Sequence, residues 1–203
     1  MTPAQAKTLL TTTPQFKFGT DSLNRLPPAV WPEIAFVGRS NVGKSSLLNA
    51  LTVSHKLAHV SKTPGRTQQI NFFLVSEKIY MVDLPGYGFA KVPPKLKQAW
   101  QALMDGYLCN RRTLRATCLL VDSRHDPKQA DIDTLQWLGT LGAAVVVVAT
   151  KSDDLAKKDH DARLAQWQAI LANNAFAWPT PFLVSIKDNR SIDALRLHLA
   201  KLL

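Results

Sequence analysis

Short, uninterrupted apolar runs alternate with stretches of helical character along this sequence, and the alternation limits the folds available to it. The apolar runs lie at 34–37, 79–82, 118–121, 143–149 and 182–184. Runs that are apolar at every position are typical of strands buried on both faces, as in a parallel sheet. The candidate helices lie at about 43–51, 94–108, 128–141, 156–173 and 191–202. The alternation therefore predicts βαβ units with right-handed crossovers.

Two apolar segments, 70–75 and 78–82, break this regularity because only Ser76 and Glu77 separate them. A helical crossover does not fit there, so we expect two antiparallel neighbouring strands. The predicted fold is α/β, with a mixed, mainly parallel, six-stranded sheet, helices on both faces, and ligand chemistry at the carboxyl ends of the strands. The length of 203 residues suits one domain. We assign the domain to 28–203 and expect residues 1–27 to be an N-terminal extension, packed on the domain or partly mobile.

The chain carries a formal net charge of +10, from 25 Lys and Arg against 15 Asp and Glu. This surplus favours an anionic macromolecular partner, because contacts with phosphates release counterions, and RNA is the leading candidate. Lysines that only keep the surface soluble are the alternative. The candidate contact residues are Lys56, Lys62, Arg66, Lys91, Lys95, Lys97, Arg111, Arg112 and Arg115.

The sequence gives little sign of a membrane, secreted or metal-cluster protein. No apolar run reaches the length of about 18 residues expected of a membrane span. No secretory signal is visible near the N-terminus, so we expect a soluble, cytoplasmic protein. Cys109 and Cys118 lie in unrelated contexts without Cys or His at ligand spacing. We therefore expect reduced, buried thiols rather than a metal site or a disulfide.

The segment after the first buried run matches the G-x-x-x-x-G-K-[ST] phosphate loop, with the required strand before it and helix after it. Its residues are Gly38, Arg39, Ser40, Asn41, Val42, Gly43, Lys44 and Ser45. Glycines let main-chain N–H groups curl around phosphates, and the helix N-terminus adds the positive end of its dipole. We expect Lys44 to reach the β- and γ-phosphates and the Ser45 hydroxyl to bind Mg²⁺. Ser46 starts the helix and is a further candidate contact.

A second motif, N/T-K-x-D, follows the apolar run 143–149 and consists of Thr150, Lys151, Ser152 and Asp153. A carboxylate at Asp153 can accept hydrogen bonds from N1 and N2 of guanine, a donor pair that adenine lacks. Lys151 would lie along the base through its alkyl stem, and Thr150 would tie this loop to the phosphate loop. A solvated cluster at the start of a helix is the alternative.

A weaker match follows the last predicted strand. There, Val184, Ser185 and Ile186 precede Lys187 and resemble the S-A-K loop that contacts guanine O6 through main-chain N–H groups. Ile186 stands where a small residue is usual, so a main-chain contact is possible but the packing differs. Together with the preceding motif, this segment indicates GTP or GDP as the ligand.

The D-x-x-G motif consists of Asp83, Leu84, Pro85 and Gly86, at the end of another predicted strand. In this motif Asp holds Mg²⁺ through water and the Gly N–H senses the γ-phosphate, whose loss would free the segment. A turn-rich stretch at 62–68 supplies Thr67 as the expected second protein ligand of Mg²⁺, with Thr63 as its competitor. Neighbouring candidate nucleotide contacts are Gly65, Arg66, Gln68 and Gln69.

Tyr87 occupies the position where Ras-type proteins place the glutamine that orients the attacking water. We therefore expect catalysis to rest on Lys44, Thr67 and Gly86 with Mg²⁺, and intrinsic hydrolysis to be slow, about 10⁻⁴ to 10⁻² per second. A partner or an additional cation would supply any missing group. Asn41 resembles the phosphate-loop Asn of potassium-activated GTPases, which helps to hold K⁺; an Asn that only stabilises the loop turn is the alternative.

Together these motifs resemble the bacterial EngB (YihA/YsxC) family of Ras-like P-loop GTPases, over nearly all of the chain. The most specific segments are 38–46, 62–68 and 83–88. The resemblance implies a GTPase that serves assembly of the large ribosomal subunit, with the subunit precursor and rRNA as partners, and that is needed for normal cell division and septation. We expect the protein to be a monomer. An RNA-binding scaffold without useful turnover and, with less support, a P-loop ATPase or kinase are the alternatives.

Overall fold

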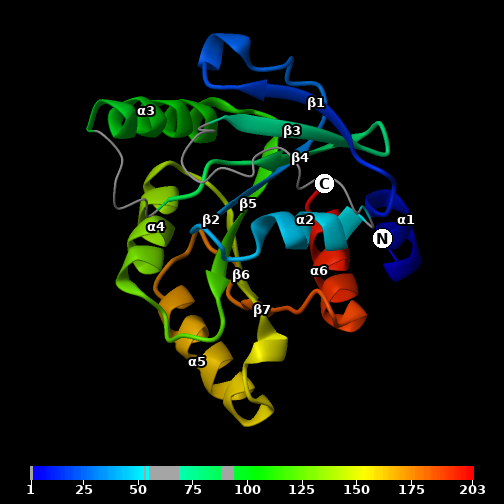
Figure 1. Cartoon of the computed structure of the whole chain (residues 1–203), viewed down its shortest axis with the longest axis vertical. Helices are drawn as coiled ribbons and strands as arrows, with labels where there is room; N and C mark the ends of the chain where they lie inside the picture. Colours follow the sequence, from blue (N-terminus) through cyan, green and yellow to red (C-terminus); the bar gives the residue numbers. More distant parts are fainter. Residues whose placement is uncertain (1, 53, 55–68, 88–93) are drawn as a thin grey trace.

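The computed structural model describes residues 2–52, 54, 69–87 and 94–203, which form a sheet with helices on both faces (Figure 1). The strands are β1 (Gln15–Thr20), β2 (Glu33–Gly38), β3 (Ile70–Val75), β4 (Ile79–Asp83), β5 (Leu114–Asp122), β6 (Val145–Thr150) and β7 (Phe182–Leu183). The α-helices are α1 (Pro3–Leu10), α2 (Lys44–Thr52), α3 (Pro94–Asn110), α4 (Gln129–Thr140), α5 (His160–Leu171) and α6 (Asn189–Lys201). The predicted α/β class is confirmed. Helix α5 begins later than predicted because a 3₁₀ turn, Lys157–Asp159, precedes it.

The sheet has seven strands in the order β1-β3-β4-β2-β5-β6-β7. Strands β4, β2, β5, β6 and β7 are parallel, whereas β3 is antiparallel to both β1 and β4. The predicted antiparallel pair is thus confirmed. Three residues, 76–78, connect β3 to β4, and the Lys78 N–H donates to the Val75 carbonyl at 3.1 Å. Ser76 and Glu77, with φ values of 52° and 54°, occupy the central positions of this tight turn. The predicted number of six strands is wrong, because β1 adds a seventh.

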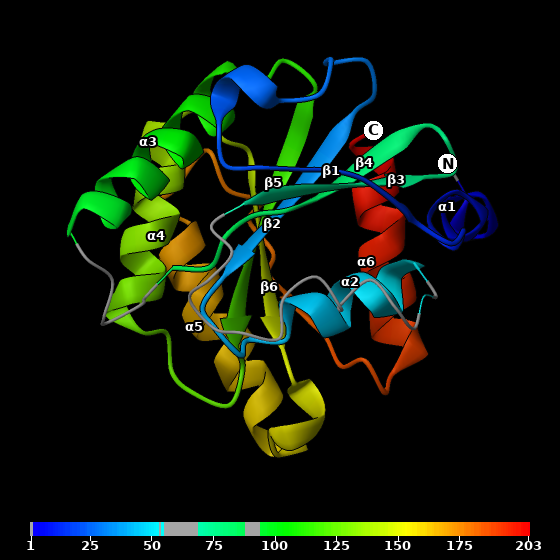
Figure 2. The ribbon, with the colours of Figure 1, turned by 45° about the horizontal axis from the view of Figure 1, so that its top comes forward.

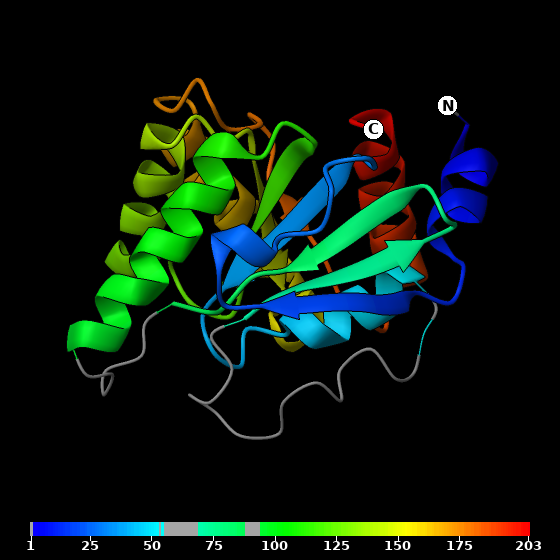
Figure 3. The same ribbon diagram turned by 90° about the horizontal axis from the view of Figure 1, so that it is seen from above.

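Strand β1 comes from the N-terminal extension and lies beside β3 at the edge of the sheet (Figure 3). Its side chains from Gln15 to Gly19 are exposed, and the register with β3 shifts between Phe16 and Phe18. A bulged edge strand lacks the uniform apolar run by which the buried strands are recognised, so its pattern gave no prediction. Helix α1 packs against α6 and buries Ala6 and Leu10. The extension therefore packs on the rest of the chain over most of its length.

The two faces of the sheet have separate apolar cores. Helices α1, α2 and α6 cover one face, and α3, α4 and α5 cover the other (Figure 2). Phe36 and Val37, neighbours in β2, are both completely buried and contribute to opposite cores, as the two-residue period of a strand dictates. No helix in the described part of the chain is long and apolar enough to cross a bilayer. The parallel strands place their carboxyl ends along one edge, which carries the loops described below.

Arg111, an expected RNA contact, belongs instead to the interior, with a side chain only 8% exposed. Its Nε donates to Oε1 of the fully buried Glu33 at 2.7 Å, and its Nη1 donates to the Pro27 carbonyl at 2.8 Å. The guanidinium lies 5.6 Å from the centroid of the Phe72 ring. The expectation for Arg111 is therefore wrong, because a buried charge must be paired. Arg112 and Arg115 are exposed.

The other expected RNA contacts receive no structural test. Lys56, Lys62, Arg66 and Lys91 lie outside the described residues, and the side chains of Lys95 and Lys97 are likewise not described. The RNA surface therefore stays a prediction.

Candidate nucleotide-binding site

The phosphate loop connects the end of β2 to the start of α2, as its motif predicts. Asn41 has a φ of 62° and Gly43 a φ of 98°, so the backbone enters the left-handed region twice before α2 begins at Lys44. Glycine takes up this conformation without steric cost, and Asn tolerates it better than most residues. A Cβ at Gly38 would lie 2.8 Å from a Val42 methyl group and 3.0 Å from Leu120. Close packing therefore requires glycine at Gly38, and the left-handed backbone favours glycine at Gly43.

Lys44 joins the phosphate loop to the D-x-x-G segment. Its Nζ pairs with the carboxylate of Asp83 and donates to the Leu84 carbonyl at 2.6 Å. The side chains of the ion pair are 15% and 22% exposed, so solvent screens the pair only in part. The Leu84 N–H donates to the carbonyl of Phe36 in β2 at 3.0 Å. The structure thus brings together two residues that the sequence assigns separately to the phosphates and to Mg²⁺.

Past Gly86 the chain continues along the phosphate loop. Tyr87 forms a parallel β-bridge with Arg39, and its N–H donates to the Gly38 carbonyl at 3.4 Å. The Tyr87 side chain is buried, and its hydroxyl donates to Oδ1 of Asp131 in α4 at 2.9 Å. The phenol therefore faces α4.

The base-recognition loop, residues 150–153, is bonded directly to the phosphate loop. Thr150 Oγ1 donates to the Val42 carbonyl at 2.6 Å, which confirms the predicted tie. Lys151 adds a second one, because its Nζ donates to the Asn41 carbonyl at 2.7 Å and to Asp122 Oδ2 at 2.9 Å. Lys151 also has a left-handed φ of 63°. The sequence predicted only a contact of its alkyl stem with the base.

Asp153, the expected guanine-reading carboxylate, is held by the loop after β7. Lys187 Nζ lies 2.7 Å from Asp153 Oδ2, and Ser185 Oγ donates to Oδ1 at 2.7 Å. These contacts from Lys187 and Ser185 lower the pKa of Asp153, so it stays a carboxylate at neutral pH. Ser185 is buried, and Ile186 is about half exposed. The weak S-A-K match therefore lies beside the base loop, as predicted.

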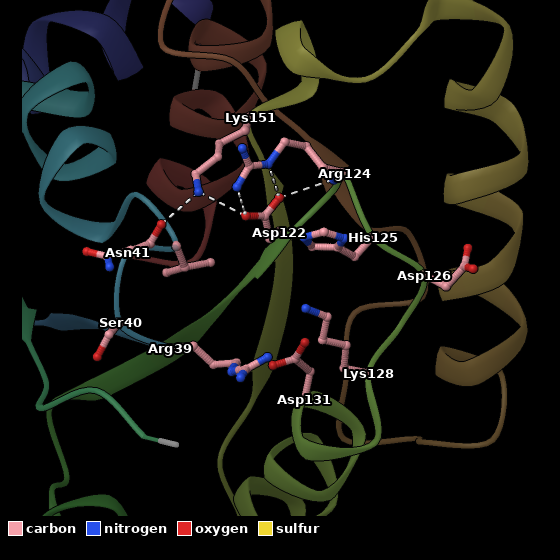
Figure 4. A pocket seen from close by; sticks show the side chains of 11 residues that line it. Arg39, Ser40, Asn41, Asp122, Arg124, His125, Asp126, Lys128, Asp131 and Lys151 are labelled. Atoms are coloured by element: carbon pink, nitrogen blue, oxygen red, sulfur yellow. Dashed lines mark hydrogen bonds and ion pairs between the residues drawn. The ribbon is translucent and has the colours of Figure 1, made fainter. Parts of the chain in front are cut away.

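Among the described residues, hollows lie on two sides of the phosphate loop. A hollow of about 200 Å³ lies next to the base loop, where the expected guanine-reading residue Asp153 is part of its wall. Its lining includes Gly43, Ser46, Thr150, Lys151, Asp153, Val184 and Ile186. The second, of about 230 Å³, lies between the phosphate loop and the start of α4 (Figure 4). Its polar lining includes Arg39, Asp122, Arg124, Lys128 and Asp131.

Sequence reasoning missed Asp122, Arg124 and Asp131. Burial acts to raise the pKa of Asp122, but hydrogen bonds from Arg124 and Lys151 outweigh it and hold this pKa well below its usual range. Asp122 is thus an ionised anchor for Lys151. A polar cluster directly after the predicted strand at 118–121 was the available signal for Asp122 and Arg124. Asp131 carried no signal, since it is an acidic residue within a helix, as Asp133 is.

Part of the predicted site lies outside the described residues, namely Thr63, Gly65, Arg66, Thr67 and Gln68. Gln69 is described and immediately precedes β3. The assignment of Thr67 as a metal ligand therefore stays a prediction. The described site residues come from the ends of β2, β4 and β6, the segment after β7, and the start of α2.

Comparison with known proteins gives consistent matches. A family model described as "50S ribosome-binding GTPase" matches residues 33–151. A probable GTP-binding protein EngB of Jannaschia sp. (strain CCS1) is 42% identical over 200 residues, which are 98% of this chain and 92% of that relative. A protein of the same description from Ruegeria pomeroyi is 44% identical over 188 residues, 93% of this chain and 87% of the relative.

Solved structures share the fold. The crystal structure of a probable GTP-binding protein engB matches with a TM-score of 0.63 at 23% identity, over 84% of this chain and 97% of the other. A GTP-binding protein from Sulfolobus solfataricus in complex with GDP matches with a TM-score of 0.58 at 21% identity, over 84% and 52%. At these identities the structures support the fold, while the sequence matches identify the relatives. The loops that meet around Lys44, Thr150 and Asp153 are thus those of a GTPase, and the chain belongs to the EngB family of GTP-binding proteins.

Proposed function

We propose that this chain is a GTP-driven switch that acts on the precursor of the large ribosomal subunit and thereby supports normal cell division and septation. The contacts of Lys44 are the observation that supports a switch, because its ammonium group binds both the Asp83 carboxylate and the Leu84 carbonyl. A ligand that competes for Lys44 must therefore disturb the D-x-x-G segment. The net charge of +10 and the ribosome-binding description of the matching family support the partner. We also propose that the protein is a cytoplasmic monomer and that its GTPase domain spans residues 28–203.

The proposed nucleotide contacts follow from the described loops. Main-chain N–H groups from Gly38 to Ser46 surround the phosphates, and Lys44 exchanges Asp83 for the β- and γ-phosphates. The N–H of Gly86 donates to the γ-phosphate. Asp153 accepts from N1 and N2 of guanine, for which its contact with Lys187 must give way, while the N–H of Ile186 faces O6.

The residues present fit Mg²⁺. Ser45, exposed in the first turn of α2, offers a hydroxyl oxygen, and Asp83 offers a carboxylate. Mg²⁺ prefers oxygen and needs only one or two protein ligands beside substrate phosphates. We propose Ser45 and Thr67 as direct ligands and Asp83 as a ligand through water; bound Mg²⁺ would neutralise phosphate charge.

A potassium ion near Asn41 is a further part of the proposal, and it predicts faster GTP turnover in potassium chloride than in sodium chloride at matched ionic strength. Asn41→Gly is the informative variant, because glycine accepts the left-handed φ of 62° but removes the side-chain oxygen. The difference between the two salts should disappear in this variant. Equal turnover of the unaltered protein in both salts would remove potassium from the mechanism and leave Asn41 as a turn residue.

Co-sedimentation with large-subunit precursors tests the partner. We expect more protein to pellet with a non-hydrolysable GTP analogue than with GDP, and binding to weaken steeply with salt. Contacts with four or more phosphates give a slope of log K against log salt of about −3 or steeper. Hydrolysis should also accelerate when precursors are added.

Lys44→Ala serves as the control, since loss of the phosphate-binding ammonium should abolish the nucleotide dependence but keep the surface charge nearly intact. Nucleotide-independent binding of the unaltered protein, without accelerated hydrolysis, would favour the RNA-binding scaffold. Absence of binding at low salt would contradict the ribosomal partner altogether.

A further inference from the structure

The hydrogen bond between Tyr87 and Asp131 joins the D-x-x-G segment to α4. The Tyr87 side chain is 8% exposed and Asp131 is 5% exposed, so water cannot readily replace either partner. Tyr87 OH lies 2.9 Å from Asp131 Oδ1, and burial keeps the pKa of Tyr87 far above its usual value. The phenol therefore remains a hydrogen-bond donor under all ordinary conditions.

The main chain on both sides of Gly86 is also held in place. Leu84 donates its N–H to the Phe36 carbonyl, and Tyr87 donates its N–H to the Gly38 carbonyl; neither bond involves Lys44, so neither competes with a nucleotide for it. Gly86 therefore lies between two fixed points: Leu84, whose side chain is buried in the apolar core, and Tyr87, whose side chain forms a hydrogen bond with α4.

Arg39 brings the phosphate loop to the same carboxylate. It is the β-bridge partner of Tyr87, and its side chain points toward Asp131 across the hollow of Figure 4. Burial raises the pKa of both Tyr87 and Asp131, and the positive charge of Arg39 acts against this rise in each. The phosphate loop, the D-x-x-G segment and α4 therefore meet at one buried carboxylate.

We propose that Tyr87 and Asp131 are a positioning pair that holds Gly86 against the phosphate loop, so that its N–H is already placed for the γ-phosphate. This inference rests on the proposed role of Gly86. If the phenol were free, ordering residues 86 and 87 would cost conformational entropy each time GTP binds. GDP lacks the γ-phosphate, so its binding would not carry that cost. A bond that only stabilised the fold would not distinguish the two nucleotides.

Tyr87→Phe tests the pair by removing one hydroxyl. Affinities for GDP and for a non-hydrolysable GTP analogue would be measured by titration with fluorescent nucleotides. We expect the affinity for the GTP analogue to fall by about tenfold, the effect of losing one hydrogen bond to a charged group, while that for GDP stays within about twofold. Maximal turnover should fall as well.

Tyr107→Phe is the matched control. Tyr107 is also a fully buried phenol whose hydroxyl donates to a buried carboxylate, that of Glu33 at 2.8 Å. Glu33 is the first residue of β2, whereas the phosphate loop follows the last residue of this strand. The Tyr107–Glu33 bond therefore lies at the end of β2 that is remote from the phosphate loop. We expect this variant to lose stability without a change in the ratio of the two affinities.

Two substitutions of Asp131 separate the hydrogen bond from the fold. Asp131→Asn keeps an acceptor for the phenol and should stay near the affinity ratio of the unaltered protein. Asp131→Ala removes the acceptor and should reproduce Tyr87→Phe, with little further effect in the double variant because both changes break the same bond.

Equal losses for both nucleotides, an unchanged ratio, or tighter binding of the GTP analogue in Tyr87→Phe would each overturn the positioning pair. Gly86→Ala separates this failure from failure of the proposed function. If Gly86→Ala weakens the GTP analogue selectively but Tyr87→Phe does not, only the pair is refuted. If Gly86→Ala leaves the affinity ratio unchanged, the proposed role of Gly86 fails, and the pair fails with it.

Discussion

Asp153→Asn is expected to reverse the base preference of the protein from guanine toward xanthine. Guanine presents two donors, N1–H and the N2 amine, whereas xanthine presents N1–H and a carbonyl oxygen. The carboxylate of Asp153 suits the first pattern, and the amide of Asn suits the second. Affinity for GDP should fall by a factor on the order of 100 or more, because a buried donor without an acceptor is costly. Competition between labelled GDP and xanthosine diphosphate measures the change.

Asp154→Asn is the matched control for this change of specificity. Asp154 is the next residue in the chain, but its carboxylate faces Arg124 at 3.8 Å, whereas Lys187 and Ser185 bind Asp153. The base preference should therefore remain that of the unaltered protein. A loss of guanine preference in Asp154→Asn but not in Asp153→Asn would show that the motif had been placed one residue too early.

Glu33→Ala is expected to lower the free energy of unfolding by about 3–5 kcal/mol, because it leaves the charge of Arg111 buried and unpaired. Glu33 accepts from Arg111 Nε and Thr113 Oγ1, both at 2.7 Å, and from Tyr107 OH at 2.8 Å. Since Arg111 also binds the Pro27 carbonyl, the network joins β2 and α3 to the segment before β2. Urea unfolding followed by circular dichroism measures the loss.

The double variant Glu33→Leu/Arg111→Met should recover much of this stability, since apolar side chains can replace a buried ion pair at little cost. The exposed pair Asp21–Arg25, with side chains 57% and 69% exposed, offers a control. Asp21→Ala should change the free energy of unfolding by less than about 1 kcal/mol. Equal effects of Glu33→Ala and Asp21→Ala would contradict the importance assigned to the buried network.

The sequence predicted those parts of the fold that local patterns encode. Strands such as β6 are buried on both faces and apolar at every position, and the short turn at Ser76 and Glu77 left only an antiparallel connection. Strand β1 could not be predicted in this way, because an exposed, bulged edge strand has no continuous apolar run. Its pairing with β3 depends on a partner about 55 residues further along the chain, which no local pattern contains.

In the candidate site, too, local features were predicted and contacts between distant residues mostly were not. The phosphate and base loops were predicted because backbone turns and ligand chemistry restrict the residue types within a few positions. The contacts between loops were mostly not predicted: Lys151 with Asp122, Lys187 with Asp153, and Tyr87 with Asp131 each bring together residues far apart in sequence. Thr150 was the exception, since its role is part of the motif.

The bonds from Thr150 and Lys151 to the carbonyls of Val42 and Asn41 have a consequence for how a nucleotide is selected. The two loops are bonded to each other, so displacement of one shifts the other, and in the proposed binding mode the base and the phosphates are not bound independently. A guanosine fragment and a free pyrophosphate should then assist each other when bound together, and their separate affinities should not sum to that of the intact nucleotide. We therefore expect the affinity for the base and the affinity for the phosphates to be coupled.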